Sequence, residues 1–288
     1  MSKKLLSVQL CALASLVSAN YAQAEDAAPS SISGWLDETI SNDYITPRGL
    51  LESDKGISSY FSGGLAVQLY HNPGGPVSDI SVHGGALFNN YSEPSAGTSG
   101  NWREFDWWAG TTLTLDGGTT FGVEYSQFAS PKEAYNADNN IEFSVTGGPI
   151  QLSKLASVTP YAKLFWNEAG TPVVVTGQRG AFDVELGFRP SLDFNAYDVP
   201  LTLTIPTWVT VGPSNFWGGG GNFGVFSTGV VAKTPLSFIP KKFGAWYLDG
   251  GVQYYRELND RLLLAQQELG VSRERDVVAA SAGLGFSF

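Results

Sequence analysis

VVAASAGLGFSF, residues Val277 to Phe288, ends the chain. From Val278 onward every second residue is apolar, and the residues between are small or polar. Successive side chains of a β-strand point to opposite faces, so this strand has one apolar and one polar face. Such a strand suits a sheet with lipid on one side and water on the other. The stretch therefore predicts the closing strand of a membrane β-barrel.

The amino-terminal residues have a different character. Lys3 and Lys4 precede a short apolar run at 5–17, and Ala22-Gln23-Ala24 has the form of a cleavage site. These features predict a secretory signal peptide. Cys11 follows Leu10, where a lipoprotein signal requires a small residue, so we do not expect lipidation. We expect a signal peptide at 1–24, a periplasmic leader at 25–33 and the barrel at 34–288.

Composition excludes several classes of protein. The formal charge of the whole chain is −10, which argues against nucleic acid as a partner because such binding needs clustered Lys and Arg. Cys11 is the only cysteine, so cleavage would leave no disulfide or thiolate site. No later apolar stretch is long enough for a membrane helix, whereas alternating strands need none.

Alternation recurs along the chain. The clearest internal strand is 104–116, where Phe105, Trp107 and Leu113 share a face. Asp116-Gly117-Gly118-Thr119 then predicts a tight hairpin. Eleven strands are clear, and a weak one at Trp35–Ile45 brings the number to the even value expected of bacterial barrels. The prediction is an all-β, transmembrane, antiparallel up-and-down β-barrel with 12 strands in the bacterial outer membrane.

Connection lengths suggest an orientation. With the amino terminus in the periplasm, the odd connections are longer than the even ones in nearly every comparison, as expected for extracellular loops. They are 46–58, 90–102, 129–139, 168–180, 213–222 and 257–276, against 71–78, 116–119, 147–156, 195–198 and 234–244. The last odd connection has a helix-forming core at 261–269, which either lies over the pore mouth or is an exposed helix. Five tryptophans near predicted strand ends or in predicted loops suggest an aromatic girdle: Trp35, Trp102, Trp166, Trp217 and Trp246.

The polar face of each strand is expected to line the lumen. The predicted lumen-lining residues are Asp79, His83, Glu104, Asp106, Glu124, Glu142, Lys163, Asp183, Glu185, Arg189, Lys233 and Asp249. Acids outnumber bases, and charged rings set the sign preference of a pore. We expect passive diffusion of small polar or cationic solutes, unless the charges pair across strands and fill the interior. Further expected partners are outer-membrane lipid and the barrel-assembly machinery, which would act through the strand ending at Phe288.

Two other functions stay open, namely an enzyme that modifies outer-membrane lipid and a plugged structural or adhesive barrel. Asp79, Ser81 and His83 share a face, but neighbours two residues apart along a strand are about 7 Å apart, too far for a catalytic hydrogen bond. The glycine runs 117–118 and 218–221 lack the lysine and helix of a phosphate loop. The acid and amides at 136–140 do not have Ca²⁺-loop spacing. We expect no catalytic residue, cofactor or metal.

The stretch Ser41-Asn42-Asp43-Tyr44-Ile45-Thr46-Pro47-Arg48-Gly49, followed by alternating strands and a terminal aromatic, resembles small outer-membrane porins of the TorF type from proteobacteria. Those porins tend to open with Ser-Asp-Tyr and a later Arg-Gly. Residues 236–240 and 243–247 are also similar to turns of porin-like barrels. This chain departs from the pattern by Asn42 and by Thr46-Pro47 before Arg48. The resemblance implies an outer-membrane barrel of unassigned substrate and carries over no catalytic residue.

Overall fold

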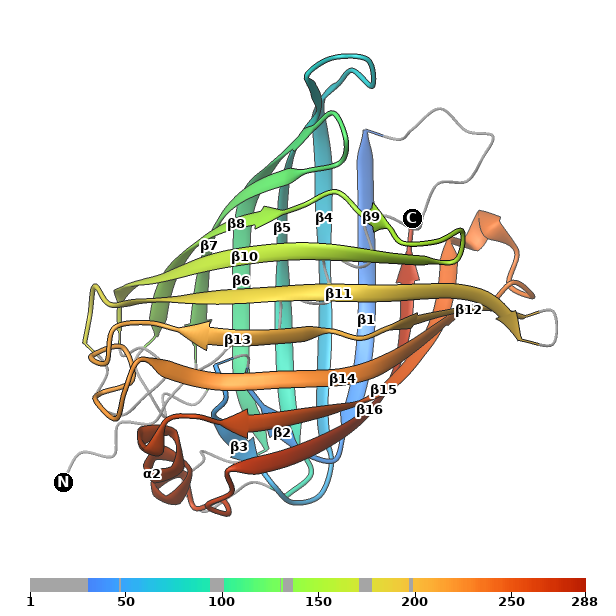
Figure 1. Ribbon diagram of the computed structural model, residues 1–288. Coiled ribbons are helices and arrows are strands. Elements are labelled where there is room, and N and C mark those ends of the chain that lie inside the picture. The colour runs from blue at the N-terminus through green and yellow to red at the C-terminus, as the bar shows by residue number, and fades with distance from the viewer. Residues whose placement is uncertain are drawn as a thin grey trace.

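The structure, a computed structural model, describes residues 31–46, 48–93, 101–129, 131, 137–170, 178–196 and 199–288, without the side chains of 102–103. The predicted signal peptide and residues 25–30 of the predicted leader lie outside these residues, whereas Ile32 and Ser33, predicted to belong to the leader, are part of the first strand. The described chain forms a closed antiparallel barrel of twelve strands, as predicted (Figure 1). Closure satisfies the backbone hydrogen bonds of every strand, which a sheet in lipid requires.

The barrel strands are β1 (Ile32–Ser41), β4 (Ser58–His71), β5 (Val77–Tyr91), β6 (Trp102–Leu115), β7 (Thr120–Ala129), β8 (Asp138–Thr146), β10 (Ala156–Ala169), β11 (Phe182–Ala196), the interrupted pair β12 (Val199–Thr204) and β13 (Thr207–Val211), β14 (Phe223–Pro235), β15 (Ala245–Glu257) and β16 (Asp276–Ser287). Shorter elements are β2 (Tyr44–Ile45), β3 (Leu51–Ser53), β9 (Ile150–Gln151), the 3-10 turn η1 (Lys241–Phe243) and the helix α2 (Asp260–Leu269).

The barrel closes between its first and last strands. β16 pairs with β15 on one side and with β1 on the other, in a register that runs from Trp35 opposite Ser287 to Ser41 opposite Ser281. Gly34 and Phe288 exchange two further backbone hydrogen bonds of 3.0 and 3.1 Å. The weak strand predicted near the amino terminus is therefore real, and the aromatic chain end has a partner.

The bounds of that first strand differ from the prediction of Trp35–Ile45. β1 begins at Ile32 and ends at Ser41. It ends there because Ser41 Oγ donates to the Asp43 carbonyl at 2.7 Å, and the side-chain oxygen of Asn42, in place of its backbone carbonyl, accepts from the Ala280 amide at 2.6 Å. The Asn42 amide still donates to the Ala280 carbonyl at 3.2 Å. The chain then leaves the wall, and Tyr44–Ile45 become β2, which pairs with β3 as a separate two-stranded hairpin.

One strand is interrupted. Pro206 has no N–H to donate, so the ladder breaks between β12 and β13. Ile205 keeps a 2.9 Å hydrogen bond to the Pro190 carbonyl. β11 and β14 each pair with both halves, so the barrel stays closed across the break.

The outer surface of the barrel is apolar. Outward-facing aliphatic and aromatic side chains on nearly every strand are exposed, among them Leu36, Leu65, Val123, Phe143, Leu186, Val230, Val252 and Leu284. Large exposed apolar surfaces mark contact with a membrane or a partner, and a band around a closed barrel marks lipid. No helix in the described part of the chain has the length and apolarity to cross a membrane.

The predicted tryptophan girdle is partly wrong. Trp166 is 40% exposed, and Trp246 contacts Phe286 of β16. Trp35 instead lies over the backbone of Gly64 on the inner face of the wall, and Trp217 is fully buried. The side chain of Trp102 lies outside the described residues. Proximity to a strand end did not distinguish inward from outward side chains, because one residue of register reverses the face.

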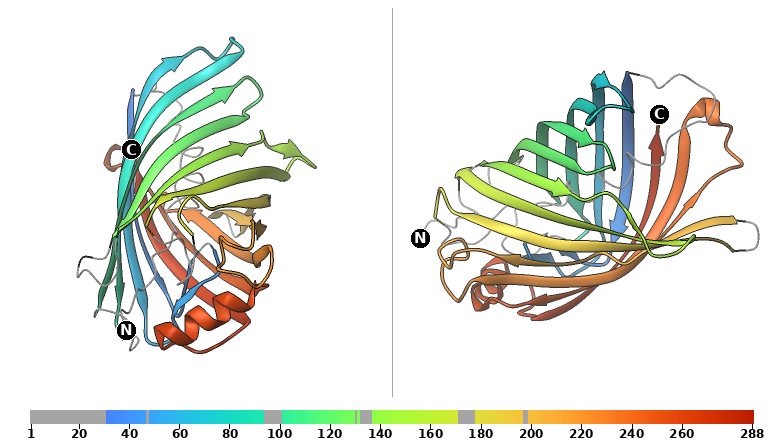
Figure 2. Two further views of the ribbon diagram at one scale, coloured as in Figure 1. Left: turned by 90° about the vertical axis from the view of Figure 1, so that its left-hand side faces the viewer. Right: turned by 45° about the horizontal axis from the view of Figure 1, so that its top comes forward.

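We name the two ends of the barrel by their connections. The loop end is where β1 finishes and β4 begins, joined by residues 42–57. The turn end is where β4 finishes and β5 begins, joined by residues 72–76. α2 lies at the loop end beside β3 (Figure 2).

Candidate functional site

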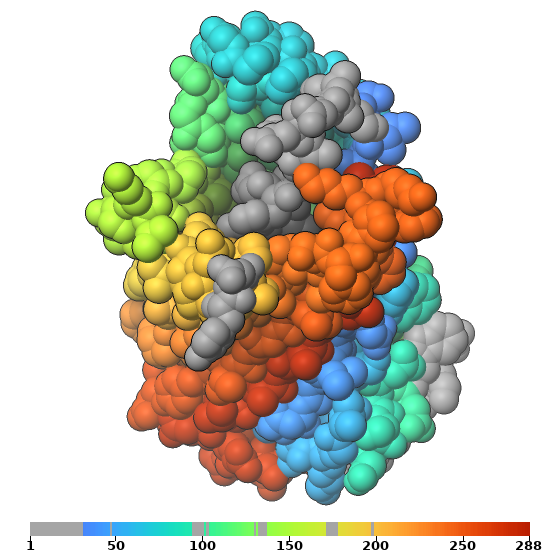
Figure 3. Space-filling view, turned by 90° about the vertical axis from the view of Figure 1, so that its right-hand side faces the viewer, coloured from blue at the N-terminus to red at the C-terminus, as the bar shows by residue number. Residues whose placement is uncertain are grey.

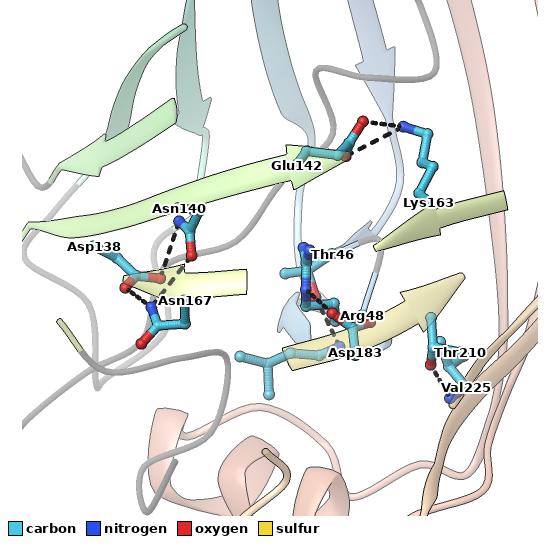
Figure 4. Close-up of polar contacts among 11 residues, drawn as sticks. Thr46, Arg48, Asp138, Asn140, Glu142, Lys163, Asn167, Asp183, Thr210 and Val225 are labelled. Carbon is cyan, nitrogen blue, oxygen red and sulfur yellow. Dashed lines mark hydrogen bonds and ion pairs between the residues drawn. The ribbon is translucent and has the colours of Figure 1, made fainter. Parts of the chain in front are cut away.

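The barrel interior carries the polar chemistry of the molecule. Lys163 Nζ lies 3.1 Å from Glu142 Oε1 (Figure 4). His83 Nε2 lies 3.1 Å from Glu124 Oε2. Glu104 and Asp106 are fully buried in the loop half, and the Tyr44 hydroxyl lies 3.5 Å from Glu104. These contacts lie on the side of the strands opposite the exposed apolar side chains.

The other predicted lumen residues have these surroundings. Asp79 accepts a hydrogen bond from Gln68 near the turn end, and Asp183 pairs with Arg48. The Tyr161 hydroxyl donates to Glu185 at 2.7 Å, and the Arg189 guanidinium lies 4.1 Å from the centre of the Tyr161 ring. Lys233 lies 3.3 Å from the centre of the Tyr247 ring, and Asp249 lies opposite Lys233 on the next strand. Several predicted charges therefore have partners. Whether these residues line a conducting path stays a prediction.

The connection expected to be an external loop, 46–58, instead folds into the barrel. We call residues 42–57, with β2 and β3, the inserted hairpin. Tyr44, Ile45, Leu50 and Leu51 are all nearly or fully buried. Four large apolar side chains in one connection cannot be left in water at low cost, since burying each contributes about 1.5–3 kcal/mol. These four side chains are buried in the interior of the loop half.

A tight turn forms the tip of the inserted hairpin. The Thr46 amide donates to the Leu50 carbonyl at 2.9 Å, and the Leu50 amide donates to Thr46 Oγ1 at 2.9 Å. Gly49 has φ +89°, a conformation that favours glycine. A Cβ at Gly49 would lie 2.6 Å from Cβ of Val225 on the wall. Glycine is needed for both the turn and the close approach.

Arg48 fixes this tip to the wall. Its Nε donates to Asp183 Oδ1 at 3.2 Å, and its guanidinium lies 3.0 Å from the centre of the Phe165 ring (Figure 4). Burial lowers the pKa of the Arg48 guanidinium, and the nearby carboxylates of Asp183, Glu142 and Glu185 oppose that shift. A charge buried this deeply is stable only when it is paired. Arg48 is thus a positive group inside an interior rich in acids.

Helix α2 closes the loop end over the inserted hairpin. Asn259 caps its first turn by accepting from the Arg261 amide at 2.9 Å, and Gly270 ends it with φ 77°. Its buried face consists of Leu262, Leu263, Ala265, Gln266 and Leu269. The predicted helix at 261–269 is confirmed, and its apolar face makes it a cover rather than an exposed helix.

One apolar cluster joins these pieces. It combines side chains of the inserted hairpin, α2, the wall and the turn at 216–217, and consists of Ile45, Leu50, Leu51, Phe128, Phe165, Ala181, Phe216, Trp217, Leu262, Ala265, Leu269, Val271 and Val277. We call it the closure cluster. Phe216 and Trp217 pack edge to face with ring centres 4.7 Å apart. The loop half is therefore packed like the core of a soluble protein.

Amides and an acid form a second contact set at the loop end. Asn167 Nδ2 donates to Asp138 Oδ1 at 2.5 Å and to Asn140 Oδ1 at 3.2 Å (Figure 4). All three residues are buried. Asp138 and Asn140 belong to β8, whose first two residues lie within the predicted connection 129–139. Within the described residues, no group of three or more His, Cys, Asp or Glu side chains is placed to hold a metal ion.

The middle and turn half of the interior are built differently. Large aromatic rings lie flat on the wall, each over a glycine directly opposite on the next strand. The pairs are Trp35 over Gly64, Trp108 over Gly85, Tyr161 over Gly187 and Tyr247 over Gly285. A ring that covers a glycine lies along the sheet instead of projecting across the barrel. Each of these rings therefore packs against the backbone of the neighbouring strand.

Sequence reasoning missed several interior residues. Arg48 and Glu52 were assigned to an external loop, Asp37 to a strand with poor alternation, and Asp138 to a polar loop. For Arg48 and Glu52, the sequence did carry a signal that their connection is buried. Ile45, Leu50 and Leu51 are apolar residues in a connection otherwise rich in charge, and a connection in water has no reason to carry them.

Comparison with solved structures finds other barrels. The β-domain of the Bordetella autotransporter BrkA is 14% identical with a TM-score of 0.48, and the alignment covers 89% of this chain and 99% of that one. An outer-membrane channel from Pseudomonas putida F1 is 10% identical with a TM-score of 0.48, covering 91% and 97%. LpxR from Salmonella typhimurium is 8% identical with a TM-score of 0.43, covering 88% and 99%.

No protein-family profile matches the sequence, and no curated protein does. The chain's own geometry gives its setting. A closed antiparallel barrel with an apolar outer band and a polar interior is built to span the bacterial outer membrane.

Proposed function

We propose that this chain is an outer-membrane channel for small polar solutes, held closed at the loop end by the inserted hairpin. One observation carries the proposal. The barrier across the interior is made by inserted segments, whereas the wall keeps its aromatic rings flat against glycines. A wall shaped in this way leaves a polar path once the inserted hairpin is displaced.

The interior charge supports cations and neutral polar molecules as the permeating class. Arg48 adds a base to the predicted set, but Asp37, Glu52 and Asp138 add three buried acids. The interior therefore stays net acidic, and a pore with excess acid favours cations. Reversal potentials in planar bilayers under a salt gradient test this step, and a clear preference for anions would contradict it.

Conductance tests closure itself. We expect the wild-type chain to show small or rare current steps, because the closure cluster packs apolar side chains across the described part of the loop half. Displacing the inserted hairpin should produce larger and longer openings, together with solute-dependent swelling of proteoliposomes. If the wild-type chain already conducts steadily at full size, the inserted hairpin is not the barrier.

A plugged structural or binding barrel is the second candidate. It is favoured by the closure cluster, whose fully buried Leu50, Trp217 and Leu262 resemble a permanent core. In that case displacing the inserted hairpin would unfold the loop half without giving selective current. The two candidates therefore differ in the result of a single variant, Arg48→Ala.

The proposal is non-catalytic. In the described chain His83 contacts Glu124, and Asp79 contacts Gln68 and His71, so Asp79, Ser81 and His83 do not form a hydrogen-bonded triad. Besides solutes, the proposed partners are outer-membrane lipid along the apolar band and the barrel-assembly machinery at the strand ending in Phe288. Assay of purified protein on lipid would test the absence of hydrolysis.

A further inference from the structure

The connection between β14 and β15 at the turn end exposes an unusual set of side chains. Phe238 is 78% exposed and Phe243 is 58% exposed, although both are large and apolar. Lys241 and Lys242 stand beside them in η1 and are also exposed. The connection, orange in Figure 3, projects from the rim as a separate lobe. Exposed aromatic side chains beside lysines call for a partner that is both apolar and anionic.

This lobe is joined to the lipid-facing surface. Trp246 Nε1 donates to the Phe243 carbonyl at 2.9 Å, and its ring lies 5.0 Å from that of Phe286. Phe288 extends the row, with its ring 5.7 Å from that of Phe286. Tryptophan prefers the boundary between the apolar core of a membrane and its headgroups. The lysines therefore stand at the level of the headgroups.

Local charge is positive without compensation. Between Val199 and Leu248 the sequence contains no Asp or Glu, although the whole chain has 27 acids. Neither Lys241 nor Lys242 forms an ion pair with any described residue, the terminal carboxylate at Phe288 included. Lys242 Nζ lies 5.0 Å from the centre of the Phe243 ring. Both ammonium groups are available to an external anion.

We propose that Lys241 and Lys242, together with Phe238, Phe243 and Trp246, bind the headgroup of an anionic phospholipid in the leaflet at the turn end. We call these five residues the lipid patch. The short connections of outer-membrane barrels face the periplasm, where that leaflet is phospholipid. The phosphate would lie between the two ammonium groups, and the acyl chains would pack on the aromatic row that continues into the apolar band.

A lipid fits these features better than a free phosphate or a protein. A soluble anion would use the lysines and leave Phe238 and Phe243 in water. The aromatic row is continuous with the apolar band, so the ligand that covers both is the membrane itself. Each lysine near an anionic membrane surface contributes about fivefold in affinity, so losing both should be readily measured.

Native mass spectrometry of the whole mature chain provides the test. The protein is released from detergent micelles containing equal amounts of phosphatidylglycerol and phosphatidylcholine, and the retained lipids are counted. We expect the wild-type chain to retain phosphatidylglycerol preferentially, and the K241Q/K242Q variant to lose about tenfold or more of that preference. The matched control is K55Q/R273Q, which removes two exposed cations at the loop end and should keep it.

A second measurement separates lipid from other anions. Phosphatidylglycerol should raise the thermal unfolding midpoint of the wild-type chain, whereas glycerol phosphate at the same concentration should not. The F238S/F243S variant should lose part of the lipid-induced increase while keeping both lysines. Equal stabilisation by glycerol phosphate, an unchanged preference in K241Q/K242Q, or an equal loss in K55Q/R273Q would each overturn the lipid patch.

Discussion

The loop half and the turn half of this barrel share the same strands, but the large side chains inside them come from different parts of the chain. In the loop half, Leu50, Trp217 and Leu262 are fully buried and come from three separate connections. In the middle and turn half, the large rings come from the wall itself and lie over glycines. Some charged side chains there remain partly exposed, as with His83 and Glu124 at 19% and 21%, whereas Arg189 is buried against the Tyr161 ring.

The difference shows where a change of state could occur. A wall residue cannot leave the interior without breaking the ladder of backbone hydrogen bonds. The inserted hairpin can leave, because its tip is held to the wall by side-chain contacts such as that of Arg48 with Asp183. Its described backbone hydrogen bonds to the rest of the chain lie at its two ends, at Asn42 and Ile57, where it joins strands that stay paired. The loop half is thus the part of the interior whose packing can be lost while the barrel survives. The following variants test that contrast.

Trp217→Ala should have the largest effect. Trp217 is fully buried in the closure cluster, and its ring fills the space beside Gly224. Truncating a fully buried tryptophan costs about 3–5 kcal/mol because it removes buried apolar area and leaves a cavity. We expect loosening of the loop half, seen as faster proteolysis within 42–57 and 258–275, while the barrel keeps its strand circular dichroism.

Trp166→Ala is the matched control for Trp217→Ala. Trp166 is 40% exposed on the outside of the wall, so its truncation should leave proteolysis of the inserted hairpin unchanged. Loss of the whole barrel in Trp217→Ala would contradict the idea that the two halves are separable.

Arg48→Ala should have the next largest effect. Removing one partner of a buried ion pair costs about 3–5 kcal/mol, because Asp183 is left as an uncompensated charge. The lost pair also fixed the hairpin tip to the wall, so we expect larger and longer current steps in planar bilayers. A cysteine introduced at Leu50 should become accessible to a thiol reagent in this background.

The double variant R48A/D183N separates charge from attachment. It removes the uncompensated carboxylate, so stability should partly recover, while the attachment stays lost and the larger current persists. Increased thiol accessibility without any current in either variant would support the plugged barrel and remove the channel proposal.

The parts of the fold that follow periodicity could be predicted from sequence. Apolar residues alternate with small or polar ones along the whole of β16, because one face of the strand is in contact with lipid and the other faces the barrel interior. Its pairing with the first strand could be predicted because a barrel must close. The bounds of β1 could not be predicted, since its end depends on Asn42 and Ala280, which are distant in sequence. Local pattern carries no information about such a contact.

From the sequence, the candidate site could be predicted only as a set of side chains on the polar faces of the strands, without the contacts between them. Alternation placed Glu142, Lys163 and Asp183 on one face of their strands, but it could not show that Asp183 would meet Arg48. That contact joins residues 135 positions apart and depends on an irregular connection folding inward. Burial of the hairpin tip also requires Gly49 beside Val225, which is a tertiary condition.

Gly85→Ala probes the turn half with a smaller effect. The added Cβ would lie 2.4 Å from the Trp108 ring and 2.6 Å from the Gly63 carbonyl. Overpacking of this kind costs about 1–3 kcal/mol. The ring can give way only toward the lumen, and the contact with the Gly63 carbonyl requires a shift of the backbone. In the Arg48→Ala background we expect reduced conductance. Gly74→Ala, where a Cβ would meet nothing within 4 Å, should leave conductance unchanged.

Glu124→Gln should have the smallest effect on structure and is the most specific test of the polar path. Glutamine can still hydrogen-bond to His83, so stability should change by less than about 1 kcal/mol. One negative charge is lost from the interior, so in the Arg48→Ala background the reversal potential should shift toward lower cation preference. Glu268→Gln removes an exposed charge from α2 and should shift it less. Equal shifts for the two variants would mean that ions do not pass His83 and Glu124, and the turn half would then be an enclosed space like the loop half.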